Sequence, residues 1–237
     1  MKIILLGYGK MGRTIEKIAI NRGHEISARI DIDNQSELDD AQGDVVIEFS
    51  HPDSAFNNIT KCLLRNLPIV SGTTGWLDRR PEVIDLCNQV DGTFFYASNY
   101  SLGVNLFFKV NEYLAKMMNG FPEYEIAMDE IHHSEKKDAP SGTAISLAEA
   151  ILKNVARKKS WVSKKTKKPD EIYIGSFRID QVPGTHVVKY ESPIDDIEIK
   201  HTAHSRDGFA LGAVLVAEWA QNKKGVLSMD DFLKFKG

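Results

Sequence analysis

The sequence predicts an α/β protein with an N-terminal Rossmann-like, doubly wound parallel sheet and a second, α+β domain with an open mixed or antiparallel sheet. Three observations support this fold class. A short apolar strand runs directly into a glycine-rich turn and a helical pattern at the N-terminus. Strand and helix patterns then alternate as far as Ala97, which is typical of parallel βαβ units. Beyond this point a long apolar helix is followed by strands of period two, which indicates a separate domain.

The composition argues against several classes of protein. The 237 residues are 42% hydrophobic, so the chain can bury a substantial core. The formal charge of -3 argues against a general nucleic-acid or membrane-surface binder. Apolar runs are too short for a membrane span, and glycines interrupt the first strand too early for a signal peptide. Cys62 and Cys87 both fall in helical patterns, so we expect no disulfide, a reducing compartment and a cytoplasmic protein.

The first strand, turn and helix form a candidate dinucleotide site. Lys2–Leu6 is a predicted buried strand, and Gly7, Gly9 and Gly12 follow it in the spacing Gly-x-Gly-x-x-Gly. In this setting the first glycine permits a tight turn, and the second lets a pyrophosphate approach the backbone. The third glycine lets the helix pack close to the strand. The free N–H groups at the start of the helix would face the phosphates.

The end of the second predicted strand bears on the choice of cofactor. Glu25–Ile30 leads to Asp31, and a carboxylate at this place can accept hydrogen bonds from the adenosine ribose hydroxyls. The acid favours NADH because it would repel a 2′-phosphate, whereas Arg29 and Lys10 are near enough to keep NADPH open. We therefore predict NADH and/or NADPH, with NADH slightly favoured. The polar segment 33–43 is predicted to be a loop.

Two further loops follow predicted strands of the first domain. Small polar residues after a parallel strand lie at the carboxyl edge of the sheet, where ligands bind in open α/β folds. One loop begins at Ser50, and the other is Ser71-Gly-Thr-Thr-Gly75, which we expect to contact the nicotinamide half of the cofactor. The remaining elements predicted for this domain are strands at 44–49, 67–70 and 93–97 and helices at 52–65 and 81–90.

The second half begins with a predicted hinge-like loop at Asn99–Asn105. The basic segment 157–170 holds six lysines and one arginine, and we interpret it as a solvated, mobile loop rather than a nucleic-acid site. An open sheet often buries one face against another subunit, so we expect a homo-oligomer. The predicted elements are helices at 106–118 and 143–156, a strand at 123–133, and three antiparallel strands at 171–179, 186–190 and 194–203.

The C-terminal segments return to helical patterns at 208–221 and 229–235, and the last should pack back on the first domain. The predicted domains are therefore a dinucleotide-binding domain of residues 1–98 and 207–237, and a substrate-binding and oligomerisation domain of residues 99–206.

Several proton donors are concentrated in Glu130–Ala144. His132 and His133 are adjacent, and Lys136 follows three residues later. Side chains of these types can act as general acids. The ordinary interpretation is a strand followed by a polar turn, but the stretch is also suited to protonating an acidic small molecule.

The same stretch ends in a candidate anion-binding helix start. Ser141 has a hydroxyl that can cap a helix, and Gly142 and Thr143 would form the first turn. The free N–H groups of such a turn bind anions. We therefore predict a cradle for a carboxylate beside the proton donors.

The stretch from His132 to Ala144 resembles, without a break, the signature H-H-x-x-K-x-D-A-P-S-G-T-A of the 4-hydroxy-tetrahydrodipicolinate reductase (dihydrodipicolinate reductase) family. The resemblance implies NAD(P)H-dependent reduction of 4-hydroxy-tetrahydrodipicolinate to tetrahydrodipicolinate in diaminopimelate and lysine biosynthesis, by a homotetramer. The substrate would be a small dicarboxylate, with no nucleic-acid or membrane partner. Further landmarks of the family are the glycine turn, Ser71–Gly75, Ala97–Asn105, His201–Arg206 and Phe209-Ala-x-Gly-Ala213.

The resemblance also implies residue roles. His132 is the catalytic donor or acceptor histidine, and Lys136 is the catalytic lysine. His133, Gly142 and Thr143 contact a substrate carboxylate, and Ser141 is predicted to join them. The predicted cofactor contacts are Gly7, Gly9, Lys10, Met11, Gly12, Asp31, Phe49, Ser50, Gly72, Thr73, Thr74, Ala97, Asn99 and Tyr100.

Departures from the family pattern keep the cofactor preference open. The segment between Asp31 and Asp44 is shorter than in many members, and Ile32 stands where relatives that accept NADPH can carry a basic residue. Three other functions stay open from the sequence. They are another Rossmann oxidoreductase acting on a small amino or hydroxy acid, a non-catalytic NADH sensor, and metal-dependent hydrolysis using Glu130, His132 and His133. We predict no metal, because adjacent histidines on an extended chain point to opposite faces.

Overall fold

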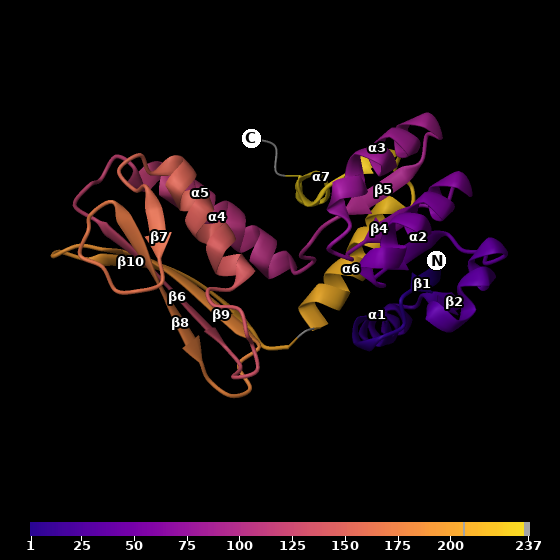
Figure 1. The fold of residues 1–237 in the computed structure, drawn as a ribbon, viewed down its shortest axis with the longest axis horizontal. Helices are drawn as coiled ribbons and strands as arrows, with labels where there is room; N and C mark the ends of the chain where they lie inside the picture. The colour runs from indigo at the N-terminus through magenta and orange to yellow at the C-terminus, as the bar shows by residue number, and fades with distance from the viewer. Residues whose placement is uncertain (206, 235–237) are drawn as a thin grey trace. The chain divides into compact units, whose positions relative to one another are not determined.

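The computed structural model describes residues 1–205 and 207–234, which form two compact units (Figure 1). Unit 1 combines Met1–Leu102 with the described C-terminal residues 207–234, and unit 2 contains the described residues 103–205. Arg206 and Phe235, which belong to the sequence landmark and the final segment named above, lie outside the described residues. Among the described helices, none has the length and apolar character that crossing a membrane requires.

The described part of unit 1 is built on a six-stranded sheet in which every pairing is parallel. Its strand order β11-β5-β4-β3-β1-β2 reverses direction between β1 and β3, so it is a doubly wound, Rossmann-like sheet as predicted. The C-terminal strand β11 was not predicted, because three residues carry too little periodicity. The strands are β1 (Lys2–Leu6), β2 (Glu25–Ile30), β3 (Val45–Glu48), β4 (Ile69–Ser71), β5 (Thr93–Tyr96) and β11 (Gly225–Leu227).

Helices cover both faces of this sheet. One apolar cluster joins α1 and α6 to one face, and a second joins α2 and α3 to the other. Both cysteines are free and buried, in α2 and α3. Met229 of α7 belongs to the first cluster, so this part of the final segment packs on unit 1 as expected. The helices are α1 (Lys10–Asn21), α2 (Pro52–Leu64), α3 (Arg80–Gln89), α6 (Asp207–Ala220) and α7 (Met229–Leu233), with a short 3₁₀ turn η2 (Leu77–Arg79).

The prediction of a loop at 33–43 was wrong in part. A 3₁₀ segment, η1 (Ile32–Asp39), occupies most of it. The Asp31 carboxylate accepts a hydrogen bond from the Ile32 N–H, and the Asn34 side chain accepts one from the Asp31 N–H. This reciprocal cap depends on side-chain hydrogen bonds, which a scan for apolar periodicity does not detect.

Unit 2 holds a mixed five-stranded sheet in the order β10-β9-β6-β8-β7. The prediction of three consecutive antiparallel strands was wrong for the first of them. β8 pairs parallel to β6 and β7, and β6 lies between β8 and β9. An alternation of apolar and polar residues shows which side chains share a face of the sheet, but it does not show which strand lies next to which. The strands are β6 (Glu125–His132), β7 (Ser160–Val162), β8 (Glu171–Arg178), β9 (Gly184–Glu191) and β10 (Asp196–Ala203).

Two helices cover one face of this sheet, α4 (Leu102–Met118) and α5 (Gly142–Asn154), and a single apolar cluster joins them to it (Figure 1). The predicted loop at Asn99–Asn105 was therefore too long, since the helix begins at Leu102. The Asn99 side chain accepts a hydrogen bond from the Ser101 N–H just before this point. Such a local polar contact supports a helix start that apolar spacing does not reveal.

The basic segment 157–170 is only partly a loop, and its interpretation as wholly mobile was wrong. It contains β7, and Lys158 within it is 2% exposed. The Lys158 ammonium donates to Glu125 at 2.7 Å, to the Pro169 carbonyl at 2.7 Å and to the Glu171 carbonyl at 3.1 Å. A lysine with three acceptors can be buried, although its residue type predicts a solvated position.

Candidate active site

The glycine turn of unit 1 has the geometry that its spacing predicted. Gly7 has a φ of +90°, and a Cβ at this residue would lie 2.1 Å from the Phe49 carbonyl oxygen. A Cβ on Gly12 would lie 2.2 Å from the Gly7 carbonyl oxygen, so neither position can carry a side chain. Gly9 is exposed and has open space around its Cβ position. The backbone at Gly9 is therefore accessible to a phosphate at the start of α1.

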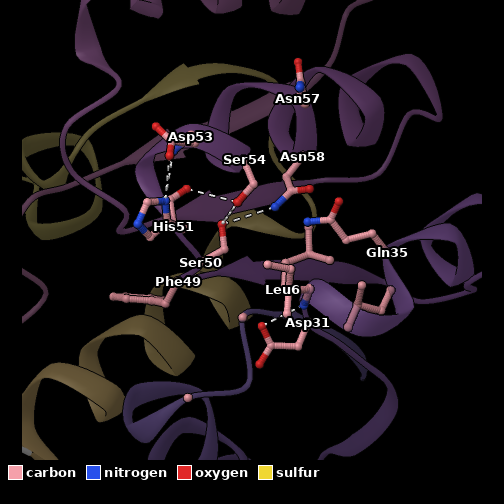
Figure 2. Close-up of a pocket in the computed structure, with 14 residues that line it drawn as sticks. Leu6, Asp31, Gln35, Phe49, Ser50, His51, Asp53, Ser54, Asn57 and Asn58 are labelled. Atoms are coloured by element: carbon pink, nitrogen blue, oxygen red, sulfur yellow. Dashed lines mark hydrogen bonds and ion pairs between the residues drawn. The ribbon is translucent and has the colours of Figure 1, made fainter.

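A pocket of about 650 Å³ lies beside this turn. Figure 2 shows the Asp31 carboxylate on one side of the pocket and the side chains of Ser50, Ser54 and Asn58 on another. Ser50 contacts Ser54 and Asn58 through its hydroxyl, at 3.2 Å in each case. The predicted cofactor residues that line this pocket are Gly7, Gly9, Asp31, Phe49 and Ser50.

A second hollow, of about 290 Å³, shares Phe49 and Ser50 with the first. The two together follow the carboxyl edge of the sheet from β2 to β4. Five predicted cofactor residues do not line either hollow, namely Lys10, Gly12, Ala97, Asn99 and Tyr100. The predicted residues that line the second hollow are Met11, Phe49, Ser50, Gly72, Thr73 and Thr74.

The Tyr100 side chain lies inside the core of unit 1 and is 1% exposed. Its ring packs against Phe49 and Phe95, and its hydroxyl donates to the Ser71 carbonyl at 2.6 Å. Burial is the main reason that the pKa of this phenol is raised. The side chain thus supports the loop after β4 from behind, and direct contacts of Ala97, Asn99 and Tyr100 with a cofactor stay predictions.

The groups around Asp31 determine what charge this end of the pocket presents. The Asp31 carboxylate accepts hydrogen bonds from the N–H groups of Tyr8, at 3.2 Å, and Ile32, at 2.9 Å. The Arg29 guanidinium is bound to the Glu16 carboxylate, with its Nε at 2.8 Å. This hydrogen bond is the main cause that lowers the pKa of Glu16. Arg29 is therefore already paired, whereas the Asp31 carboxylate faces the pocket.

Sequence reasoning missed Glu48, which organises both loops at the sheet edge. Glu48 is fully buried at the end of β3. Its carboxylate accepts hydrogen bonds from the Ser50 N–H at 2.9 Å, the Thr73 hydroxyl at 2.7 Å and the Ser71 hydroxyl at 2.6 Å. The sequence did contain a signal for this role. Glu48 ends an otherwise apolar strand, and hydroxyl residues follow both this strand and the next one.

In unit 2, strand register brings four polar side chains together at one end of the sheet. Glu130 and His132 are two residues apart on β6, so they share a face. Arg178 on β8 is the register partner of His132, and His186 on β9 is the partner of Glu130. Of these, only His132 was predicted as a site residue. Arg178 and His186 are cross-strand neighbours from distant parts of the chain, so local spacing could not identify them. Glu130, two residues before His132 on the same strand, could have been identified from period two.

The Glu130 carboxylate is fully buried between two cationic or polar partners. It forms a hydrogen bond with Nδ1 of His132, and it accepts one from Nη1 of Arg178 at 2.9 Å. Burial raises the pKa of Glu130, but the hydrogen bonds from His132 and Arg178 outweigh burial and lower it to about 2. Glu130 is therefore an anion at neutral pH, and it orients the His132 ring so that Nε2 is the free nitrogen.

His186 packs against His132 with ring centroids 5.1 Å apart and an angle of 71° between the rings. Its Nε2 lies 3.0 Å from the Ser141 hydroxyl oxygen. Burial, followed by the neighbouring His132, lowers the pKa of His186 to about 4. His186 is therefore uncharged at neutral pH. It lies between the His132 ring, which it packs against, and Ser141 at the start of α5, to which it is hydrogen-bonded.

The loop after β6 carries Lys136. The Lys136 ammonium pairs with both carboxylate oxygens of Asp138, at 2.8 and 2.9 Å. This hydrogen bond is the main cause that lowers the pKa of Asp138. His133, which follows the last residue of β6, is partly exposed, and its carbonyl accepts the Lys136 N–H at 3.2 Å. His133 and Lys136 thus lie in one short segment that directly follows the Glu130 and His132 pair.

The start of α5 has the form that the sequence predicted. The Ser141 hydroxyl caps the helix by accepting the Ala144 N–H at 3.2 Å. Gly142 is exposed, no atom of the described residues lies within 4 Å of its Cβ position, and Thr143 is partly exposed. Ser141 is 2% exposed, so its hydroxyl contributes by holding the helix start and His186. A direct contact of Ser141 with a substrate stays a prediction.

Comparison with known families gives a single assignment for both units. The family models described as the N-terminus and the C-terminus of dihydrodipicolinate reductase match residues 1–100 and 103–233. The chain belongs to the dihydrodipicolinate reductase family. The resemblance inferred from the sequence is confirmed.

Two curated members of the dihydrodipicolinate reductase family are similar along nearly the whole chain. The 4-hydroxy-tetrahydrodipicolinate reductase of Christiangramia forsetii is 51% identical over 234 residues, which is 98% of each chain. The enzyme of the same name from Archaeoglobus fulgidus is 34% identical over 253 aligned positions, covering 95% of this chain and 96% of its own.

Solved structures support the fold. The dipicolinate-bound dihydrodipicolinate reductase from Paenisporosarcina sp. TG-14 superposes with a TM-score of 0.81 over 98% of both chains, at 21% identity. A probable dehydrogenase from Thermotoga maritima gives a TM-score of 0.56 at 9% identity, covering 98% of this chain and 92% of its own. At sequence identities this low, the similarity to these two structures supports the fold alone.

Three side chains of this dihydrodipicolinate reductase family member could supply metal ligands within the described residues. Ligand atoms of Glu130, His132 and His186 all lie within 4.8 Å of one another. His133, which the metal hypothesis from the sequence required, is not in this group. The Arg178 guanidinium on Glu130 opposes a cation there. Absence of a metal from the working protein stays a prediction.

Proposed function

We propose that the chain catalyses the NAD(P)H-dependent reduction of 4-hydroxy-tetrahydrodipicolinate to tetrahydrodipicolinate, in the diaminopimelate route to lysine. Water leaves the hydroxylated ring, one hydride and one proton are added, and the nicotinamide is oxidised. The observation that carries the proposal is the complete His132–Ala144 signature, folded so that His132, Lys136 and the open start of α5 occupy one end of unit 2.

The start of α5 is suited to one carboxylate of the substrate. The N–H groups of Gly142 and Thr143 are at the positive end of the helix dipole, and no acidic residue lies in the first turn. A hydroxyl from Thr143 and the ring of His133 can add hydrogen bonds to the same anion. We assign binding and orientation of the substrate to these three residues.

When bound, the reduced nicotinamide supplies the hydride. The chain itself supplies the proton and stabilises the charge that develops on the ring. Lys136 is the proposed donor, and its ammonium, now paired with Asp138, also stabilises negative charge in the transition state. His132 acts beside it as donor or acceptor through Nε2, since Glu130 holds its Nδ1.

The edge of unit 1 fits a dinucleotide. The open backbone at Gly9 and the start of α1, which has no acidic residue in its first turn, suit the pyrophosphate. Asp31 suits the adenosine ribose, and the loop organised by Glu48 suits the nicotinamide half. NADH is the proposed preference, because Asp31 would repel a 2′-phosphate and Arg29 is already paired with Glu16.

A homotetramer is the proposed assembly. It rests on the family resemblance and on one observation: α4 and α5 cover one face of the unit 2 sheet, while Phe177 on the other face is 46% exposed. Sedimentation equilibrium over a range of concentrations measures the assembly, and a stable monomer would contradict it.

The test of the activity follows the absorbance of NADH, and of NADPH in parallel, on mixing the protein with substrate made in situ from pyruvate and aspartate semialdehyde by the preceding enzyme. We expect rapid oxidation, faster with NADH at limiting cofactor. Binding of NADH without any oxidation would discard the proposed substrate and favour an NADH sensor or a different oxidoreductase.

A further inference from the structure

One guanidinium contacts both parts of the proposed catalytic machinery of unit 2. Arg178, the last residue of β8, donates from Nη1 to the Glu130 carboxylate at 2.9 Å. It also donates from Nε to the Lys136 carbonyl at 3.2 Å and from Nη2 to the Asp138 carbonyl at 2.6 Å. We propose that Arg178 is a positioning residue that holds His132 and Lys136 in one catalytic arrangement, an inference that rests on the proposed function.

Arg178 acts on strand β6 through the Glu130 carboxylate. Glu130 is fully buried, and a buried carboxylate needs partners to stay charged. It has His132 on one oxygen and Arg178 on the other. Because the guanidinium holds the second oxygen, the first is directed at Nδ1 of His132, which leaves Nε2 of the ring for the substrate. Nε2 would lie 3.1 Å from a Cβ on Gly184, so the glycine leaves more room at this nitrogen of the buried His132 ring than another residue would.

Arg178 also holds the loop that follows β6. The segment that carries Lys136 has no strand pairing of its own. Arg178 binds two of its carbonyls, on either side of Lys137, and a hydrogen bond from Ser134 to Asp180 gives a further tie nearer its start. The flat, rigid fork of arginine can hold three acceptors in fixed directions, whereas lysine offers a single charged point. Arg178 therefore sets the loop position relative to β6.

The charges around His132 predict how the loss of Arg178 would appear. His132 is faced by Glu130 on its own strand, Arg178 on β8 and His186 on β9, and the charge of Lys136 in the loop acts on His186. The Arg178 hydrogen bond is one of the causes that lower the pKa of Glu130, so its removal raises that pKa. A protonated Glu130 holds Nδ1–H of His132 less strongly, because the hydrogen bond loses its assistance from the negative charge. The acid limb of the pH profile of kcat, where kcat decreases as pH falls, should then move to higher pH.

The experiment compares Arg178→Gln and Arg178→Lys with a matched control, Arg157→Gln. Arg157 is also in unit 2 and also binds two backbone carbonyls, those of Met118 at 3.1 Å and Tyr124 at 2.8 Å. We expect Arg178→Gln to lower kcat by about 10²-fold, the scale of a small misplacement of reacting groups. Arg178→Lys should recover little of this loss. The Kd for NADH should be unchanged, and Arg157→Gln should keep the wild-type kcat and acid limb.

A readout independent of turnover is the ¹⁵N NMR spectrum of the His132 side chain. We expect the proton on Nδ1 in the wild type and Arg157→Gln, and a mixture of tautomers in Arg178→Gln. If Arg178→Gln does not fold, Glu130→Gln, which cannot ionise, replaces it, with an altered His132 spectrum and a lost acid limb expected.

The outcomes separate the two proposals. Wild-type kcat in Arg178→Gln, or a lower kcat with an unchanged His132 spectrum and acid limb, would overturn the positioning role. If the wild type oxidises neither NADH nor NADPH, the proposed function fails, and the His132 spectrum alone then decides whether Arg178 positions the ring.

Discussion

Glu48 at the end of β3 accepts a hydrogen bond from the Thr73 hydroxyl in the loop after β4, at 2.7 Å and away from solvent. The same carboxylate holds Ser50 and Ser71. One buried acid thus connects two loops that the sequence could only place separately at the carboxyl edge of the sheet. The shape of the proposed nicotinamide end depends on this connection.

Replacing Glu48 should therefore affect both stability and cofactor binding. Glu48→Ala leaves buried hydroxyl and N–H groups without their acceptor, which should lower the free energy of unfolding by about 3 kcal/mol. The Kd for NADH should rise because the loops lose their fixed positions. Urea unfolding and fluorescence titration measure the two effects. Glu25→Ala, at an exposed position of unit 1, is the control. A Glu48→Ala variant as stable as this control would contradict the proposed role of Glu48 in holding the two loops.

Asp31 should act on the cofactor and not on the chemical step. Asp31→Ala removes the proposed acceptor for the ribose hydroxyls, so the Kd for NADH should rise about tenfold or more, from lost hydrogen bonds to a charged group. The preference for NADH over NADPH should shrink. Calorimetry and initial rates measure both. Asp33→Ala, a nearby exposed acid, should change neither. Loss of turnover at saturating NADH would be inconsistent with this role.

Lys136 should act on the chemical step. Lys136→Met keeps the length of the side chain but removes the ammonium, so kcat should fall by about 10²–10⁴-fold, the usual range for a general acid. The Kd for NADH should stay near normal. The neighbouring, exposed Lys137→Met is the matched control and should keep its activity. An unchanged kcat in Lys136→Met would remove this residue from the mechanism.

His186 predicts a dependence of stability on pH. Its folded pKa, about 4, is below its ordinary value of 6.5. Above pH 6.5 His186 is neutral in both the folded and the unfolded state. Its full contribution to the free energy of unfolding is therefore present there. Between pH 6.5 and 4 the unfolded state binds a proton that the folded state excludes, so the free energy of unfolding decreases as pH falls, by up to about 3 kcal/mol.

The variant His186→Gln isolates this effect. The glutamine amide has about the reach of Nε2, the atom that contacts Ser141, but it does not titrate. Urea unfolding at a series of pH values should give a shallower decrease between pH 6.5 and 4 in the variant than in the wild type. Equal slopes would show that His186 is protonated in the folded state over this range.

The sequence by itself determined the features that depend on neighbours along the chain. These are the strand, glycine turn and helix around Gly7, the acid at Asp31, the capped start of α5 at Ser141, and the His132–Ala144 stretch that led to the family. Turn geometry, helix caps and periodicity depend on residues a few positions apart, so they can be recognised from spacing alone.

Only the tertiary structure decided the features that depend on pairing between distant segments. Local period two does not specify a strand's partner, so the parallel placement of β8 beside β6 came from packing of the whole sheet. That register put Arg178 and His186 beside His132, and sheet order likewise put Ser71 and Thr73 against Glu48. Buried charges such as Glu130 and Lys158 are stable only because these distant partners meet them, which is why their residue types alone predicted exposure.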